Sequence, residues 1–134
     1  MATTTASILL NSPDIMSSQT VNISKSSNLK QAGKRTIGIE STTGLAMKTL
    51  EQVTAATIID YSADDITGSA AKIYVRNTSS STTQYLVVKI GAQIIGRLYG
   101  GDFMFIPYTG GDSADITVTP STSAKVIVEY IAFY

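Results

Sequence analysis

The sequence predicts an all-β protein, an antiparallel β-sandwich of jelly-roll type with an extended N-terminal arm. Serine and threonine together supply 34 of the 134 residues, while the helix formers lysine and glutamate are scarce. Short runs in which apolar and polar residues alternate fill residues 71–134, as in half-buried strands. Turn residues separate these runs about every 8–12 residues, a spacing typical of sandwiches and small barrels.

The first 40 residues differ in texture from the rest of the chain and are predicted to form the arm. Their apolar residues stand in small groups within a Ser/Thr-rich background, at positions 8–10, 21 and 23, and 37 and 39. The last two groups alternate with polar residues, which favours thin strands of an arm or a sheet edge. Residues 41–134 are predicted to form the sandwich domain.

The start of this domain is ambiguous. Leu45, Ala46, Leu50 and Val53 fall near helical spacing, and their residue types permit a helix. We therefore expect one short helix or irregular turn over residues 45–57, followed by a strand over 55–61.

The later strands follow from clear alternation. Strands are expected over residues 72–76, 85–90, 94–99, 103–106, 116–118 and 124–134, with a loop at 77–83 and turns at 91–92, 100–102 and 110–113. Both glycine pairs, at 100–101 and 110–111, stand between strands, so they are interpreted as hairpin turns and not as phosphate-binding loops. The predicted core consists of Ile73, Val75, Leu86, Val88, Ile94, Leu98, Phe103, Phe105, Val126 and Val128.

Composition excludes much chemistry. The chain has no Cys and no His, so disulfides, thiolate metal sites and the usual serine triad are excluded. We predict a protein with no catalytic activity, no cofactor and no metal. Asp64-Asp65 and the pair Asp112 and Asp115 could bind calcium, but no regular acidic spacing supports this, and solvated turn acids are the favoured interpretation.

Charge and apolar patterning favour assembly with neighbours. Ten basic and ten acidic residues give zero net charge, and charged residues make up 15% of the chain against about 25% in ordinary domains. The final run, residues 126–134, is apolar on both faces, with Val126, Val128 and Tyr130 on one face and Ile127, Ile131 and Phe133 on the other. The face turned away from the core must be covered by the N-terminal half or by a neighbouring subunit. We expect a homo-oligomer.

Two surface features leave alternatives open. The basic stretch Lys25, Lys30, Lys34 and Arg35 could contact nucleic acid or an acidic protein surface, or form a solvated arm, and nucleic acid is the least favoured of these. A set of four tyrosines could line a sugar-binding face, although cross-strand packing on a sheet is favoured: Tyr74, Tyr85, Tyr99 and Tyr108. The N-terminus lacks the pattern of a secretory signal and no segment is long enough to span a bilayer, so we expect a soluble protein, made in a cytosol, with no membrane partner.

Residues 70–134 resemble a known family. The resemblance lies in residues 73–78 (IYVRNT), 85–88 (YLVV), 94–98 (IIGRL), 100–103 (GGDF) and 126–131 (VIVEYI). This succession of strands and turns resembles the small β-sandwich virion proteins of tailed bacteriophages. The resemblance implies a non-enzymatic structural role in the virion, after synthesis in the host cytoplasm, as a capsid decoration (cement) protein, a neck or tail accessory protein or a fibre-attached module.

We expect a capsid decoration protein that stabilises the phage head by bridging capsomers. Its partners would be the major capsid protein or other virion proteins, and the resemblance implies a trimer. The alternative is a neck, tail or fibre accessory protein with a receptor- or carbohydrate-binding β-sandwich. The candidate assembly contacts are Ile8, Leu9, Leu10, Lys25, Lys30, Lys34, Arg35, Ile127, Ile131, Phe133 and Tyr134.

Overall fold

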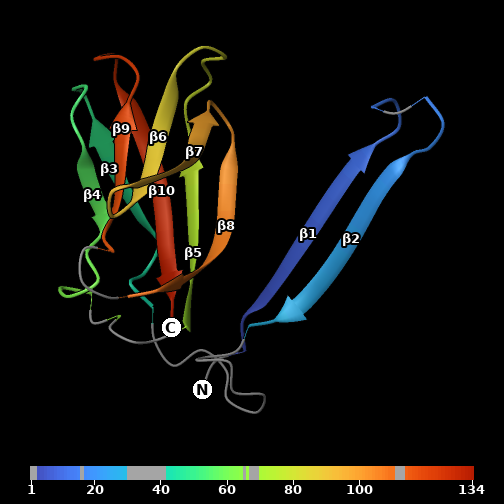
Figure 1. Ribbon diagram of the computed structural model, residues 1–134, viewed down its shortest axis with the longest axis horizontal. Helices are drawn as coiled ribbons and strands as arrows, with labels where there is room; N and C mark the ends of the chain where they lie inside the picture. The colour runs from blue at the N-terminus through green and yellow to red at the C-terminus, as the bar shows by residue number, and fades with distance from the viewer. Residues whose placement is uncertain (1–2, 16, 30–41, 65, 67–69, 111–113) are drawn as a thin grey trace. The chain divides into compact units, whose positions relative to one another are not determined.

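The computed structural model describes residues 3–15, 17–29, 42–64, 66, 70–110 and 114–134. Within these ranges every regular element is a strand and all strand pairs are antiparallel (Figure 1), so the all-β prediction is confirmed. The chain divides into two compact units, Met1–Glu40 and Ser41–Tyr134. The strands are β1 Thr5–Ser12, β2 Val21–Asn28, β3 Ala46–Leu50, β4 Ala56–Ile59, β5 Ala70–Asn77, β6 Tyr85–Ile90, β7 Gln93–Tyr99, β8 Phe103–Thr109, β9 Ile116–Pro120 and β10 Val126–Phe133.

The described residues of the first unit form a β-hairpin. β1 and β2 pair along their full length, from Thr5 opposite Asn28 to Ser12 opposite Val21. The N–H of Leu29 donates a 2.7 Å hydrogen bond to the Thr4 carbonyl and extends the open end of the hairpin. The strand expected around residues 21–23 is therefore confirmed, whereas the one expected at residues 37–39 lies outside the described residues.

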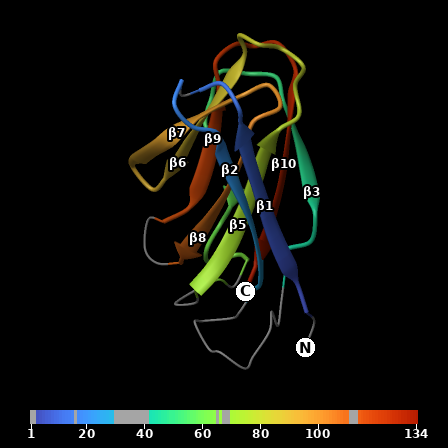
Figure 2. The same ribbon diagram turned by 90° about the vertical axis from the view of Figure 1, so that its right-hand side faces the viewer.

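The second unit contains two four-stranded sheets. The first sheet has the strand order β3-β10-β5-β8 and the second has the order β4-β9-β6-β7. Along the chain, every connection between these strands crosses from one sheet to the other except the β6–β7 hairpin (Figure 1). Figure 2 shows the same strands after a quarter turn, with β3 and β8 flanking β10 and β5.

Both sheets contribute to one hydrophobic core. Ile73, Val75 and Val128 of the first sheet belong to the same buried cluster as Leu86 and Val118 of the second. We call the face of each sheet that lies in this cluster its inner face and the opposite face its outer face. Seven predicted core residues are buried there as expected: Ile73, Val75, Leu86, Val88, Leu98, Val126 and Val128.

Three residues predicted to lie in the core do not lie there, and a β-bulge explains the first of them. Ile94 is 65% exposed. In the β6–β7 pair, Val88 lies opposite Gly96 but Lys89 lies opposite Ile94, so Ile95 is an extra residue in β7. An extra residue reverses the alternation of side chains beyond it, and Ile94 therefore shares the outer face with Lys89.

The other two errors come from strand β8, where apolar residues occupy both faces. Phe103 and Phe105 are 63% and 43% exposed. Met104 and Ile106 lie opposite the buried residues Val75 and Ile73 of β5 and pack against the core in their place. The sheet places the two phenylalanines on its outer face.

For residues 45–57 we expected a short helix or an irregular turn, and the helix is wrong. Residues 46–50 form β3, which pairs with β10 from Ala46 opposite Tyr130 to Leu50 opposite Val126. Backbone pairing with β10 and burial of Leu50 override a weak helical preference. Bends follow at residues 52–54, and the strand expected over 55–61 is confirmed as β4.

Candidate docking surfaces

The sheet edges of the second unit are protected against pairing with further strands. On β3, Lys48 lies opposite the buried residue Val128, and its ammonium group donates a 3.1 Å hydrogen bond to the Thr57 carbonyl of β4. β8 contains Pro107, and β4 and β7 each pair with a shifted register. Inward-pointing charges, prolines and bulges all hinder edge-to-edge association. Contacts with other proteins are therefore expected on the sheet faces or on the hairpin.

The described residues of the first unit leave one apolar face of the hairpin uncovered. The register places Ile8 opposite Lys25 and Leu10 opposite Ile23 on this face. Ile8, Leu10 and Ile23 are 46%, 48% and 42% exposed. A two-stranded hairpin is marginally stable by itself in water, so an exposed face of this kind needs a partner.

The opposite face of the hairpin is polar. Thr5 and Ser7 form side-chain hydrogen bonds of 2.9 and 3.2 Å with Asn28 and Ser26 across the two strands. Leu9, although 70% exposed, lies on this face and opposite Ser24. Of the predicted contacts in this unit, Ile8, Leu10 and Lys25 therefore share one face and Leu9 does not. The remaining three, Lys30, Lys34 and Arg35, lie outside the described residues.

The outer face of the first sheet is the second candidate docking surface. Its rows are set by the strand registers. The first row runs across the four strands as Met47, Glu129, Arg76 and Phe103. The next row contains Ile131, Tyr74 and Phe105, and the one after it Phe133, Lys72 and Pro107.

This outer face is unusually apolar for a surface. Met47 is 64% exposed and Phe103 63% exposed at its two sides, and the predicted contacts Ile127, Ile131 and Phe133 of β10 are half-buried between them. Tyr134 differs from these three, because its ring packs against the core and its hydroxyl donates a 2.8 Å hydrogen bond to the Asp64 carbonyl. Aromatic residues, Met and Arg are the types enriched at protein interfaces.

The centre of the same face is polar and ordered. The Tyr74 hydroxyl donates a 2.8 Å hydrogen bond to Oε1 of Glu129. Burial and the neighbouring Glu129 carboxylate raise the pKa of Tyr74 above its ordinary value, so the phenol keeps its proton at neutral pH. Glu129 is thereby held in place directly beside Arg76.

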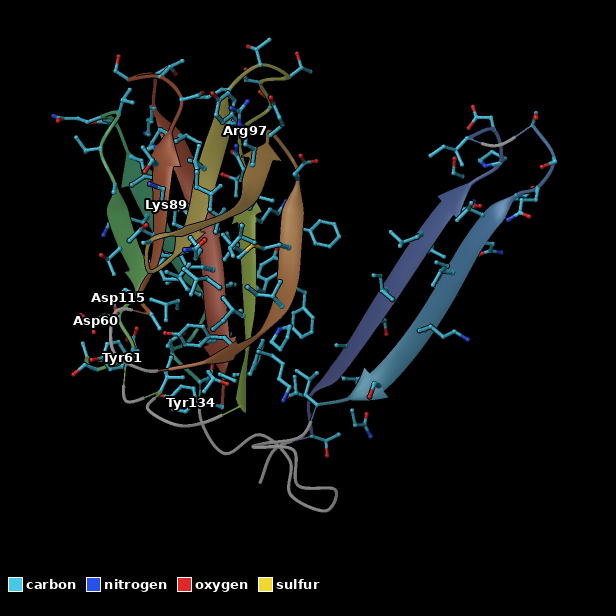
Figure 3. The ribbon with its side chains drawn as sticks, viewed as in Figure 1. Asp60, Tyr61, Lys89, Arg97, Asp115 and Tyr134 are labelled. Atoms are coloured by element: carbon cyan, nitrogen blue, oxygen red, sulfur yellow. The ribbon has the colours of Figure 1, made fainter. Side chains whose placement is uncertain are left out.

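The outer face of the second sheet has a different character. The rings of Tyr85 and Tyr99 pack across β6 and β7 with centroids 5.2 Å apart, and the Arg97 guanidinium lies 4.5 Å from the centre of the Tyr85 ring. Figure 3 shows Arg97 and Lys89 along this part of the unit. The favoured interpretation, cross-strand packing, is confirmed for this tyrosine pair.

The four tyrosines considered for sugar binding do not share a face. Tyr85 and Tyr99 lie on the second sheet, and Tyr74 lies on the outer face of the first. Tyr108 is buried in the core, and its hydroxyl donates a 2.8 Å hydrogen bond to the Ala114 carbonyl. The hypothesis that all four tyrosines line one sugar-binding face is therefore wrong.

Carboxylates gather at the end of the second unit where Tyr134 lies, as Figure 3 shows for Asp60 and Asp115 beside Tyr61. Asp115 accepts a 3.1 Å hydrogen bond from the Tyr61 N–H. Asp60 accepts from the N–H groups of Ser62 and Ala63, each at 3.0 Å, and Asp64 accepts from the Asp60 N–H at 3.0 Å. These bonds fix the turn after β4.

These turn acids include the residues considered for calcium binding. Among the described residues no three acidic side chains are grouped so that they could hold a metal ion. Asp65 and Asp112, the other members of the predicted pairs, lie outside the described residues.

The same carboxylates affect a neighbouring tyrosine. Burial, together with the charges of Asp115, Asp60 and Asp64, raises the pKa of Tyr108 to about 12.

Searches of protein-family models, of curated proteins and of solved structures found no match to this chain. In the part of the chain that the structure describes, no helix is long and apolar enough to cross a membrane. Any functional conclusion therefore depends on the surfaces described above.

Sequence reasoning missed the two ends of the row on the first sheet. Met47 fell within the segment expected to be helical or irregular, and Phe103 was assigned to the core. One sequence signal could have placed Phe103 correctly. Pro107 lies four residues after Phe103, so the two side chains share a face of the strand, and proline is typical of an exposed edge strand. Arg76 and Glu129 were visible as charges, but their pairing required the β5–β10 register.

Proposed function

We propose that this chain is a non-enzymatic structural protein of a tailed-phage virion, and that it is a capsid decoration protein which stabilises the head by bridging capsomers. Its partners are the major capsid protein or other virion proteins, and it acts as a homo-oligomer, with the trimer implied by the resemblance as the first expectation. Its location is the virion, after synthesis in the host cytoplasm.

The proposed fold is a jelly-roll β-sandwich. The strand orders β3-β10-β5-β8 and β4-β9-β6-β7 support it, because eight strands in two such sheets are the pattern of a double-sheet jelly roll. Jelly rolls occur in viral capsid and lectin domains, which suits a structural or binding role. Function cannot be taken from a fold alone, so the docking surfaces have to support the role.

The observation that favours bridging most is the hairpin with an uncovered apolar face. It belongs to a compact unit of its own, distinct from the unit with the hydrophobic core. Its apolar face contains Ile8, Leu10 and Ile23, and no described strand of that unit covers it. An apolar hairpin of this kind can dock on a neighbouring protein while the second unit stays folded on its own core.

The test compares two faces of the same hairpin. Phage heads that lack the protein are incubated with purified full-length chain, and bound protein is measured after sedimentation. The double variant Ile8→Ser, Leu10→Ser changes the apolar face, and Leu9→Ser changes the polar face at a more exposed leucine. We expect at least tenfold weaker binding for the double variant and less than twofold change for Leu9→Ser.

Deletion of residues 1–40 provides the second arm of this test. The remaining unit holds the whole buried core cluster, so it should stay folded by circular dichroism and yet fail to bind heads. Equal binding by the deletion variant and the full chain would refute the bridging role.

The alternative function is a receptor- or carbohydrate-binding module of a neck, tail or fibre. One observation favours it: Tyr99 is 37% exposed on the outer face of the second sheet, next to the Arg97–Tyr85 contact. Exposed aromatic rings can stack on sugar. Loss of adsorption to host cells in Tyr99→Ala, together with no binding of the wild-type chain to heads, would support the alternative over decoration.

A further inference from the structure

On the outer face of the first sheet, one row of side chains is complementary to itself after a two-fold rotation. This row consists of Met47, Glu129, Arg76 and Phe103. We propose that two copies of this chain pack through this face, about a two-fold axis that runs along the strands between β10 and β5. Arg76 of each copy then lies opposite Glu129 of the other. This inference rests on the proposed structural role and deepens it, because it names the face through which the copies associate. It predicts a pair, or a hexamer built of three pairs, in place of the simple trimer that the resemblance implies.

The sheet order places the axis at the middle of the sheet. β10 and β5 are its two central strands, and β3 and β8 are its edges. Rotation about an axis between the central strands exchanges β10 with β5 and β3 with β8. An interface made in this way uses the same patch on both copies, as two-fold interfaces require.

The row through Glu129 matches itself after this exchange. Glu129 pairs with Met47 on one side and with Arg76 on the other, and Arg76 pairs with Phe103. Read across the strands, the row is apolar, acid, base, apolar. After rotation, base faces acid and Phe103 faces Met47, a favourable sulfur–aromatic combination.

The adjoining rows are compatible with the same pairing. Tyr74 and Ile131 are opposite each other on the two central strands, so rotation places the ring of one copy over the aliphatic side chain of the other. Lys72 and Phe133 are likewise opposite each other, so the Lys72 chain falls over an aromatic ring, a contact open to lysine cations. Outside the central row, each of these side chains therefore meets an apolar side chain, and no two like charges face each other.

The central charges identify a second copy as the occupant. A purely apolar partner would bury Arg76 and Glu129 without new charged neighbours, which is costly. A second copy brings an acid to each base and a base to each acid at the same level of the sheet. Glu129 already accepts a 2.8 Å hydrogen bond from Tyr74. The position of its carboxylate is therefore fixed before the two copies associate.

Face-to-face pairing also agrees with the state of the edges. The inward Lys48, Pro107 and the two register shifts disfavour growth of either sheet by a further strand. Two sheets packed on each other with strand directions roughly aligned are a common arrangement.

The experiment uses charge reversal in two separate full-length proteins, measured by sedimentation in particle-free buffer. We expect the wild type to contain an even number of copies, and Arg76→Glu and Glu129→Arg each to associate at least tenfold more weakly. In a mixture of the two variants, glutamates of one chain face arginines of the other at both contacts. Mixing should therefore restore association to within about threefold of the wild type, as one-to-one pairs.

Matched apolar variants provide the control. Phe103→Ser removes a side chain from the proposed interface, and Ile94→Ser removes an equally exposed one from the second sheet, at 63% and 65% exposure. Only Phe103→Ser should weaken association, and both should keep the wild-type melting temperature within a few degrees.

Several results would overturn the pairing. These are a wild type with an odd number of copies, charge-reversal variants that associate as the wild type does, or a mixture that stays dissociated. Unchanged association of Phe103→Ser combined with lost head binding would assign this face to a virion protein instead. Head binding by the hairpin variants is measured separately, so failure of the pairing and failure of the proposed function are distinguishable.

Discussion

The side-chain amide of Asn77 donates a 2.9 Å hydrogen bond to the carbonyl oxygen of Leu98, and so joins the end of β5 in the first sheet to the edge strand β7 of the second. Asn77 is fully buried. Its side-chain oxygen accepts a 3.0 Å bond from the Ser79 N–H, and its carbonyl accepts a 2.8 Å bond from the Gly101 N–H. One polar residue therefore fixes two loops and an otherwise exposed sheet edge.

Replacement of Asn77 by Ala should lower the free energy of unfolding by about 2–4 kcal/mol, because it leaves the Leu98 carbonyl and the Ser79 N–H without their partners, each at a cost of roughly 1–3 kcal/mol. Urea denaturation followed by circular dichroism measures the change. Asn22→Ala, at an exposed hairpin position, is the control and should change stability by less than about 0.5 kcal/mol. Equal effects of the two substitutions would contradict this account.

Two glycines in neighbouring elements should respond oppositely to alanine. A Cβ at Gly100 would collide with the backbone carbonyls of Ser79 and Ser81, whereas a Cβ at Gly96 meets nothing within 4 Å. Gly100→Ala should therefore destabilise by about 2 kcal/mol or more, and Gly96→Ala should be neutral or stabilise by up to about 1 kcal/mol. The melting temperatures of both variants test this difference, and a larger loss at Gly96 would disprove it.

The pairing of β5 with β8 predicts very different effects for substitutions at two large apolar residues, Ile73 of β5 and Phe105 of β8. Ile73 is fully buried, while Phe105 is 43% exposed on the outer face. Ile73→Ala should cost about 2–5 kcal/mol through the cavity that it leaves, and Phe105→Ser about 1 kcal/mol or less. Chemical denaturation of the two variants measures both values. If Phe105→Ser unfolds the domain, the assigned register is incorrect.

Stability should fall in alkaline solution because of Tyr108. Its pKa is about 12 in the folded protein against 10.0 for an ordinary tyrosine, chiefly through burial and then through Asp115, Asp60 and Asp64. The folded state thus holds this proton more tightly than the unfolded state does. The contribution to the free energy of unfolding is complete below pH 10 and is lost as the pH rises towards 12.

Urea denaturation across this pH range, with the ultraviolet absorbance of tyrosinate as a second signal, measures the decline. Tyr108→Phe should show a shallower decline, although Tyr74 and Tyr130 also have raised pKa values and will leave part of it. Identical profiles for the variant and the wild type would exclude Tyr108 as a source.

The sequence by itself determined the strand content and most of the core. Period-two alternation identified residues such as Val75, Val88 and Val128 as buried, because apolar side chains that recur at every second position share one face of a strand. It also identified β10 as apolar on both faces, which indicated that its outer side needs a partner. These conclusions depend on local pattern alone.

Tertiary structure decided the cases in which local pattern was ambiguous. In β8 both faces are apolar, so pairing with β5 determined that Met104 faces the core and Phe103 faces outward. In β7 one extra residue moved Ile94 to the outer face. Arg76 and Glu129, 53 residues apart in the sequence, are opposite each other only because β5 and β10 pair in this register. Register is a property of paired strands, and a single strand's sequence does not contain it.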